Sequence, residues 1–320
     1  MRPLIILTGP TAVGKTSLSI KLARAIGGEI VSADSMQVYR HMDIGSAKVT
    51  LEEMGGVPHY LIDVLDPTEE FHVALFAELA KQAVETIYSH GKIPIIVGGT
   101  GFYIQALLYD IDFTECGEDK NIREELERLG EEKGAGYLHA MLKEIDPEAA
   151  EEIHENNRKR VIRAIEYYRQ TGERISEHNK RERQKKSPYD FLYYVLTTDR
   201  AELYERIEMR VDSMLDAGLI DEVKNLKDMG CTRDMVSMQG LGYKEILDYL
   251  QGNVSLDEAV SILKRDTRHF AKRQLTWFKR ERDVTWLNLK DYGDDREKVL
   301  SKILEDVREK YGLEIRNHGN

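Results

Sequence analysis

The sequence predicts an α/β fold, in which a parallel sheet covered by helices is interrupted by an all-helical insertion domain. Three observations support this prediction. Short apolar runs alternate with helical patterns over residues 1 to about 112, as is typical of parallel sheets. A glycine-rich segment directly follows the first of these runs. Strand patterns then disappear between about 115 and 187, where the chain becomes helical and highly charged.

The expected strands fall on both sides of the helical stretch. Four runs in the first part of the chain have strand character: Leu4–Leu7, Ile30–Val31, Tyr60–Val64 and Ile93–Val97. Two more strands are expected later, at Phe191–Leu196 and Val284–Leu287. We therefore expect residues 1–115 and 188–320 to form one α/β core, and residues 116–187 to form the insertion domain.

Nothing in the sequence indicates a membrane or an oxidising compartment. The apolar run before Thr8 is too short for a signal sequence, and no later run approaches the thickness of a bilayer. The two cysteines, Cys116 and Cys231, lie far apart without metal-ligand spacing, so structural zinc is not expected. A cytoplasmic protein is predicted, and no segment indicates an obligate protein partner.

Positive charge is concentrated in two stretches, although the net charge of the 320-residue chain is −11. Residues 158–186 contain eleven basic and four acidic residues, and residues 264–282 contain eight and two. Such runs form either ordinary solvated helix faces or a surface that neutralises nucleic-acid phosphates. In the second stretch, helical spacing places Lys264, Arg268 and Lys272 on one face. The apolar residues expected to face the core there are Val260, Leu263, Phe270 and Trp277.

The most specific motif is a phosphate-binding loop after the first apolar run. Residues 9–16 read GPTAVGKT, match the P-loop pattern G-x-x-x-x-G-K-[ST] and precede a helical pattern. The core is therefore predicted to be P-loop NTPase-like and to bind a di- or triphosphate. Lys15 would reach the phosphates, and the Thr16 hydroxyl would hold Mg²⁺, the cofactor we expect. The phosphate-binding residues predicted from this motif are Gly9, Pro10, Thr11, Ala12, Val13, Gly14, Lys15 and Thr16.

A carboxylate follows the second expected strand. Because residues just beyond a strand's carboxyl end face the ligand crevice of such a sheet, Asp34 should lie near the P-loop. There it could accept a proton from a nucleophile, or it could simply cap a helix. An ordinary P-loop ATPase or kinase carries an Asp at a strand end to orient Mg²⁺, but here the strand runs into Gly98-Gly99. Asp63 is the only comparable candidate, so a hydrolase or kinase is disfavoured.

Seven blocks of the sequence resemble the bacterial tRNA dimethylallyltransferases, also called tRNA isopentenyltransferases. They occur in the family's order and span nearly the whole chain. The blocks are GPTAVGKT, Ser32–Lys48, His59–Pro67, Val97–Tyr103, Lys159–Glu166, Gln239–Glu245 and Lys272–Phe278. The resemblance implies transfer of a dimethylallyl group from dimethylallyl diphosphate to N6 of adenosine 37, immediately 3′ of the anticodon, in tRNAs that read codons beginning with U.

The resemblance also implies roles for individual residues. Asp34 matches the family's general base, and Thr11 matches a position that contacts the donor. Arg206 and Arg210 lie one helical turn apart, and Arg210 matches an arginine that assists the diphosphate, whereas Arg206 could be a surface ion-pair partner. The predicted catalytic residues are thus Asp34, Lys15, Thr16 and Arg210. The residues expected to contact tRNA are Asp34, Ser35, Met36, Gln37, Thr100, Arg123, Lys159, Arg160, Val161, Ile162, Arg163, Lys272, Arg273, Gln274 and Lys279.

Three other functions remain open from the sequence. A related prenyltransferase could modify free AMP, ADP or ATP with the same core, although the basic helical stretch favours tRNA. A small-molecule kinase would also use the P-loop, but the acidic strand end is missing. A noncatalytic RNA-binding GTPase or ATPase would bind RNA without prenylating it.

Overall fold

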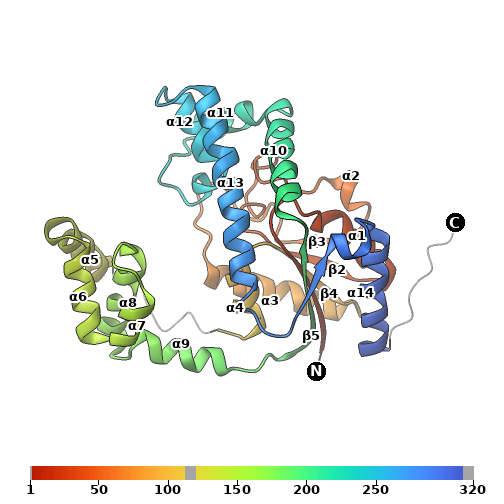
Figure 1. The fold of residues 1–320 in the computed structure, drawn as a ribbon, viewed down its shortest axis with the longest axis horizontal. Coiled ribbons are helices and arrows are strands. Elements are labelled where there is room, and N and C mark those ends of the chain that lie inside the picture. The colour runs from red at the N-terminus through yellow and green to blue at the C-terminus, as the bar shows by residue number, and fades with distance from the viewer. Residues whose placement is uncertain (1, 112–119, 313–320) are drawn as a thin grey trace. The chain divides into compact units, whose positions relative to one another are not determined.

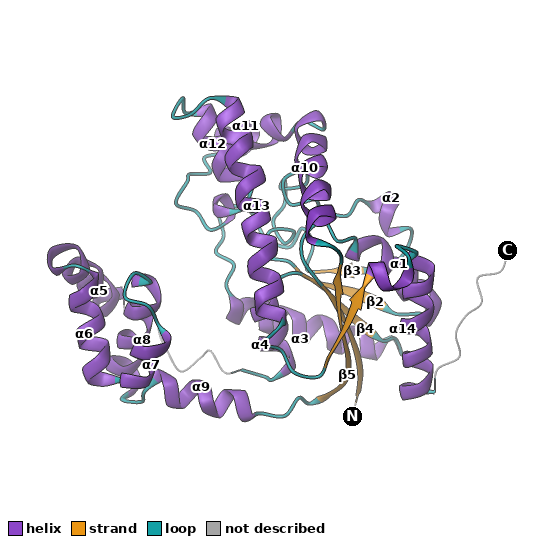
Figure 2. Cartoon of the chain, in the orientation of Figure 1, coloured by secondary structure: helices purple, strands orange, loops and turns teal. Residues whose placement is uncertain are grey.

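The computed structural model describes residues 2–111 and 120–312, and its centre is a six-stranded, all-parallel sheet (Figures 1 and 2). The strands lie in the order β3-β2-β4-β1-β5-β6. Their bounds are β1 Arg2–Thr8, β2 Glu29–Ala33, β3 His59–Tyr60, β4 Pro94–Gly98, β5 Tyr189–Thr197 and β6 Val284–Asn288. The predicted parallel sheet is confirmed, and the loop after β1 leaves the sheet near its middle, between β4 and β5.

One predicted strand is much shorter than expected. The sequence predicted a strand over Tyr60–Val64, but β3 ends at Tyr60. Leu61 and Asp63 have backbone φ angles of 63° and 55°, which lie in the left-handed region and are incompatible with an extended strand. The chain therefore turns away from the sheet edge directly after Tyr60.

Helices cover both faces of the sheet. Ile5 and Leu7 of β1 share a buried cluster with Leu22 of α1 and Ile303 of α14, so these two helices cover one face. The alternating residues of β1 point to the opposite face, which α3 covers (Figure 1). The helices of the core are α1 Lys15–Ile26, α2 Leu51–Met54, α3 Val73–Ser89, α4 Gly101–Leu108, α10 Arg200–Asp216, α11 Leu219–Asp228, α12 Tyr243–Leu250, α13 Leu256–Phe278 and α14 Arg296–Tyr311.

Helix α13 packs with a different face from the one expected. Leu263 is buried as predicted, but Val260, Phe270 and Trp277 are only partly buried. The buried stripe consists of Ala259, Leu263, Thr267, Ala271, Gln274 and Phe278. Small and polar side chains in this stripe let α13 approach α10 and α12 closely, and the expectation from hydrophobicity alone was therefore wrong.

Two of the three basic residues expected to form a surface on α13 form ion pairs within the protein. Lys264 forms an ion pair with Asp212 at 2.6 Å, and Arg268 forms one with Glu208 at 2.6 Å, both carboxylates lying on α10. These two cations fasten α13 to α10, which leaves Lys272 as the exposed member of that row.

A second compact unit comprises Leu108–Pro188, whereas Met1–Leu107 and Tyr189–Asn320 form the first. The domain joint expected at residues 115–116 lies outside the described residues. The second unit consists of helices around a core of its own, in which Leu126, Leu138 and Ile165 are fully buried. Its helices are α5 Lys120–Lys133, α6 Ala135–Ile145, α7 Pro147–Glu152, α8 Arg158–Thr171 and α9 Ile175–Gln184. Within residues 2–111 and 120–312, no helix has both the length and the apolar character that crossing a bilayer requires.

Candidate active site at the carboxyl edge of the sheet

The glycine-rich loop has the geometry that its sequence predicts. It runs from the end of β1 to the first turn of α1, and the buried Val13 anchors it to the core. Gly9 has a φ of 147°, and a Cβ at this position would lie 2.5 Å from the carbonyl oxygen of Leu196. Gly14, at a φ of 98°, is the N-cap of α1. The loop therefore turns its backbone toward the positive end of a helix, where an anion binds well.

Lys15 lies in this loop with its charge poorly compensated. Its Nζ donates hydrogen bonds to the carbonyl oxygens of Gly9 and Pro10, each at 2.9 Å. Burial and the nearby Arg210 lower the pKa of Lys15 to about 8, although the Asp34 carboxylate opposes this shift. A bound anion would compensate both cations and restore the charge of Lys15.

Arg210 reaches the same loop from α10. Its Nη1 lies 3.2 Å from the Thr11 hydroxyl oxygen and donates to it. Burial lowers the pKa of Arg210, although Asp34 and Glu53 favour its charged form. Arg206, one turn earlier, forms an ion pair with Glu202 of the same helix. The two arginines that the sequence placed on one helix face thus have different partners, and Arg210 is the one that contacts the P-loop.

Gln274 joins the P-loop to the loop that follows β4. Its Oε1 accepts a hydrogen bond from the backbone N–H of Thr11 at 2.9 Å, and its Nε2 donates to the carbonyl oxygen of Gly99 at 3.0 Å. The residue is only 7% exposed. Its assignment as a tRNA contact is therefore corrected: both ends of the side-chain amide are used to hold two loops of the core together.

Asp34 follows β2 and turns toward the P-loop cations. Its Oδ1 accepts the backbone N–H groups of Met36 at 2.9 Å and Gln37 at 3.4 Å, which fixes the carboxylate in a turn. No helix starts there, since residues 35–50 contain none, so the helix-cap alternative is wrong. Within the described part of the chain, Oδ2 has no hydrogen-bond partner. Asp34 thus has one oxygen that holds its position and another directed to no protein donor.

The residues expected around the acceptor lie near Asp34. Ser35, Met36 and Gln37 are all partly exposed in the turn that Asp34 fixes. Thr100 is partly exposed as well, and its backbone N–H donates to the carbonyl oxygen of Ala33 at 3.3 Å. The structure therefore brings these four predicted residues to the ends of the neighbouring strands β2 and β4.

The basic residues predicted to grip tRNA are not all on a surface. In the helical unit, Lys159 and Arg160 are exposed, whereas Val161 and Ile162 are buried in that unit's core at 0% and 2% exposure. The side chains of these two apolar residues are therefore not RNA contacts, which corrects the prediction. Arg163 is half-buried and forms an ion pair with the buried Glu166 at 3.3 Å.

Two other groups of predicted basic residues have different environments. Arg123 lies 3.8 Å from the same Glu166 carboxylate that Arg163 contacts, so both arginines are oriented by one buried acid. The side chains of Lys272 and Arg273 on α13, and of Lys279 directly after it, are exposed.

Two cations that the sequence analysis missed also support the site. Arg296, at the start of α14, donates from Nη1 to the Ser17 hydroxyl at 2.7 Å and lies against Gly14. Burial and the nearby Arg206 lower the pKa of Arg296. No local pattern could have indicated this contact, because it depends on the packing of α14 against α1.

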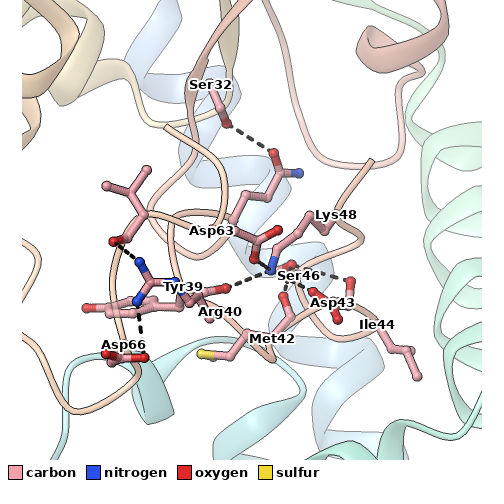
Figure 3. Close-up of polar contacts among 12 residues, drawn as sticks. Ser32, Tyr39, Arg40, Met42, Asp43, Ile44, Ser46, Lys48, Asp63 and Asp66 are labelled. Atoms are coloured by element: carbon pink, nitrogen blue, oxygen red, sulfur yellow. Dashed lines mark hydrogen bonds and ion pairs between the residues drawn. The ribbon is translucent and has the colours of Figure 1, made fainter. Parts of the chain in front are cut away.

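Lys48 is the other cation, and its side chain is 5% exposed. Its Nζ lies 2.6 Å from Oδ1 of Asp43 and 2.6 Å from Oδ1 of Asp63, and it donates to the carbonyl oxygen of Tyr39 at 2.6 Å (Figure 3). Asp63, the candidate Mg²⁺-orienting acid, is thus an ion-pair partner that fixes a loop. Lys48 is the last residue of the block Ser32–Lys48 that resembles the family, and this resemblance could have indicated its importance.

The donor set of the loop fits Mg²⁺. Thr16 is exposed at the first turn of α1, and among the described residues its hydroxyl has no hydrogen-bond partner. The described residues contain no cluster of three acidic, histidine or cysteine side chains that could enclose a metal ion. Mg²⁺ commonly binds through one or two protein oxygens together with substrate phosphates and water, and the Thr16 hydroxyl would be such an oxygen if a diphosphate occupied the loop.

A family model and a close relative match the chain over most of its length. The model described as IPP transferase matches residues 37–281. A tRNA dimethylallyltransferase from Lachnoclostridium phytofermentans is 63% identical over 310 residues, which cover 97% of this chain and 99% of the relative.

Two solved structures are also similar to this chain over nearly its whole length. The full-length tRNA isopentenylpyrophosphate transferase of Bacillus halodurans is 46% identical with a TM-score of 0.72, and the match covers 97% of this chain and 98% of the other. A eukaryotic dimethylallyltransferase described as acting on tRNA is 29% identical with a TM-score of 0.82, covering 99% of this chain and 82% of the other.

Proposed function

The chain belongs to the IPP transferase family, and we propose that it is a tRNA prenyltransferase. It transfers a dimethylallyl group from dimethylallyl diphosphate to N6 of adenosine 37, 3′ of the anticodon, in tRNAs that read codons beginning with U. One observation of the structure supports this most directly. A carboxylate, Asp34, lies opposite two poorly compensated cations, Lys15 and Arg210, so that a proton acceptor and a diphosphate cradle share one edge of the sheet.

The donor diphosphate would occupy the P-loop. When the C–O bond to the allylic carbon breaks, negative charge grows on the leaving diphosphate, and Lys15, Arg210 and the backbone N–H groups of the loop stabilise that charge. Arg210 also contacts Thr11, so the loop and the guanidinium are held as one cradle. Mg²⁺ held by Thr16 would supply further neutralisation of the diphosphate.

The acceptor amine would approach from the side of Asp34. The exocyclic N6 of adenine is a weak nucleophile, and as it bonds to the allylic carbon it must lose a proton. Oδ2 of Asp34 can accept this proton while Oδ1 remains bonded to the turn. Because the base must leave its stack to reach this carboxylate, Ser35, Met36, Gln37 and Thr100 would line the pocket that receives it.

The exposed basic residues supply the long-range attraction for the tRNA. The exposed side chains are those of Lys159 and Arg160 in the helical unit, Lys272 and Arg273 on α13, and Lys279 directly after α13, and they can neutralise phosphates. This is how a chain with a net charge of −11 can bind a polyanion.

The decisive experiment is mass analysis of tRNA nucleosides after incubation with the protein, Mg²⁺ and dimethylallyl diphosphate. We expect a dimethylallyl group on the adenosine 3′ of the anticodon. Parallel reactions with AMP, ADP and ATP as acceptors test the free-nucleotide alternative, and transfer of phosphate from ATP tests the kinase alternative. RNA binding that depends on a nucleotide, without any prenylated product, would instead support a noncatalytic RNA-binding NTPase.

A matched pair of variants tests the diphosphate cradle. Arg210→Gln should weaken donor binding and slow transfer, because it removes a cation at the P-loop. Arg200→Gln removes the same charge at the exposed start of the same helix, where the guanidinium contacts Tyr204, and should leave donor affinity within a few-fold of the wild type. Equal losses in both variants would contradict the assignment of Arg210.

A further inference from the structure

The loop that follows Asp34 is held by a single carboxylate from α11. Glu222 accepts three consecutive backbone N–H groups with its two oxygens: those of Asp43 at 2.9 Å, Ile44 at 2.7 Å and Gly45 at 3.0 Å. Residues 42–47 form no helix or strand, so these N–H groups have no regular backbone ladder to join. Glu222 replaces that ladder with charge-assisted hydrogen bonds, which are stronger than neutral ones.

Tyr243 completes this arrangement from the start of α12. Its hydroxyl donates to Glu222 at 2.8 Å and accepts the next N–H group of the loop, that of Ser46, at 3.0 Å. The tyrosine is fully buried, and burial together with the neighbouring Glu222 raises the pKa of its hydroxyl well above the usual value, so it stays protonated. A Cβ on Gly45 would lie 2.6 Å from the Tyr243 ring, so the loop approaches this ring as closely as only glycine permits.

The glycines before Tyr243 place α12 beside the acceptor turn. A Cβ on Gly240 would lie 2.6 Å from the sulfur of Met36, a residue of the turn that Asp34 fixes. The block Gln239–Glu245, which had no role in the sequence analysis, therefore packs against the acceptor side of the site.

A short chain of hydrogen bonds connects this loop to Asp34. The carbonyl oxygen of Ala47 accepts from Nε2 of Gln37 at 3.3 Å, and Oε1 of Gln37 accepts from the Ser32 hydroxyl at 3.0 Å. The backbone N–H of Gln37 in turn donates to Oδ1 of Asp34 at 3.4 Å. Figure 3 shows Asp43, Ile44 and Ser46 of this loop beside Lys48, whose ammonium is paired with the Asp43 carboxylate. Displacement of residues 43–47 would therefore move Gln37, one of the two residues whose backbone N–H groups hold Asp34.

We propose that Glu222, together with Tyr243, is a positioning residue that acts through Asp34: it fixes loop 43–47, and this loop fixes the direction in which the base faces the acceptor amine. The inference rests on the proposed function of Asp34 as general base. The carboxylate of Glu222 is bonded to the loop and to Tyr243 and not to the P-loop, so its removal should impair proton transfer while the donor cradle around Lys15 stays intact.

The test compares Glu222→Gln with Asp221→Asn, an exposed acid on the same helix turn. Glu222→Gln keeps the shape but replaces one carboxylate oxygen by an N–H donor that opposes the N–H groups of the loop. We expect its kcat to fall by roughly 10- to 100-fold, which is less than the roughly 10²- to 10⁴-fold that general-base catalysis contributes in full, because Asp34 is displaced and not removed. The Kd for dimethylallyl diphosphate should stay within about twofold of the wild type, and Asp221→Asn should behave as the wild type.

A double-mutant cycle separates a positioning role from a merely structural one. In an Asp34→Asn background, Glu222→Gln should cause no further loss of kcat, because the residue through which it acts is already disabled. Full additivity of the two losses, or a matching loss of donor affinity, would overturn the proposal. Tyr243→Phe removes one hydroxyl only and should show the same pattern with a smaller loss, which keeps the test usable where Glu222→Gln folds poorly.

Hydrogen exchange gives a readout that does not depend on transfer activity. The amide protons of Asp43, Ile44, Gly45 and Ser46 should exchange faster in Glu222→Gln than in Asp221→Asn, with exchange in β1 and β4 unchanged. Unchanged exchange at these four amides would refute the loop-holding role itself. If the wild type makes no prenylated tRNA while the loop amides respond as expected, the proposed function fails and the structural role of Glu222 stands.

Discussion

The lowered pKa of Lys15 predicts that donor affinity declines above neutral pH. The buried ammonium, next to Arg210, has a pKa of about 8, compared with 10.5 for an ordinary lysine. As the pH rises through 8, Lys15 loses the charge that we expect to hold the diphosphate. The donor itself is already about 90% ionised at pH 7 and more so above it, since phosphate groups titrate near pH 6, so nearly all of the change belongs to the protein.

The magnitude follows from this pKa. A group with a pKa of about 8 is roughly 90% protonated at pH 7 and roughly 10% at pH 9, so the Kd for the donor should rise about tenfold between these values. The lowered pKa also means that the free protein destabilises the charged form of Lys15 by about 3 kcal/mol. Because the unfolded chain binds this proton more tightly, Lys15→Met should raise the stability of the ligand-free protein near pH 7.

Calorimetric titration of the protein with dimethylallyl diphosphate, without tRNA, measures the Kd at each pH and the number of protons taken up on binding. At pH 8 we expect uptake of roughly half a proton per donor bound, seen as a dependence of the binding enthalpy on the ionisation enthalpy of the buffer. Lys15→Arg, whose charge persists at every accessible pH, should lose the pH dependence. A constant Kd from pH 7 to 9.5 with no proton uptake would refute the reasoning.

Three other predictions concern the rest of the site. Asp34→Asn should retain donor affinity and lose roughly 10²- to 10⁴-fold in kcat, which single-turnover assays with saturating donor and tRNA can measure; near-normal turnover would remove its assigned role. Gln274→Leu should lower the stability by about 1–3 kcal/mol in denaturant unfolding, because it leaves two backbone groups of neighbouring loops without partners, and it should also weaken donor binding. Neutralising Lys159, Arg160 and Arg163 together should weaken tRNA binding and reduce the slope of log K against log salt by up to about 0.9 per lost phosphate contact, and an unchanged slope would exclude this segment as the RNA surface.

The sequence predicted those parts of the fold that local patterns encode. The P-loop could be predicted because its chemistry requires glycines and a lysine at fixed spacing. The four inner strands could be predicted because their apolar runs are largely buried on both sides. The strand expected over Tyr60–Val64 failed because the left-handed backbone at Leu61 and Asp63 has no signature in hydrophobicity. Positive φ at residues other than glycine is set by the surrounding packing.

Contacts between distant segments account for the site residues that sequence reasoning misplaced. Gln274 lies in a basic stretch, and only the approach of α13 to the P-loop shows that its amide holds two loops. Arg296 and Glu222 have ordinary charged neighbours in sequence, and their roles arise from partners more than a hundred residues away. Such residues can be found only when the tertiary structure is known.

The position of the helical unit within the chain has a consequence for how the protein folds. β1 lies at the very start of the chain, yet its partner β5 follows the whole of that unit, with Arg2 paired to Tyr189. During synthesis, β1 can pair with β4 on one side, but its other edge must wait unpaired while α5 to α9 form from local contacts. Closure of the central sheet is thus expected to be a late and slow step, and the exposed edge of β1 is where a nascent chain would first aggregate or engage a chaperone.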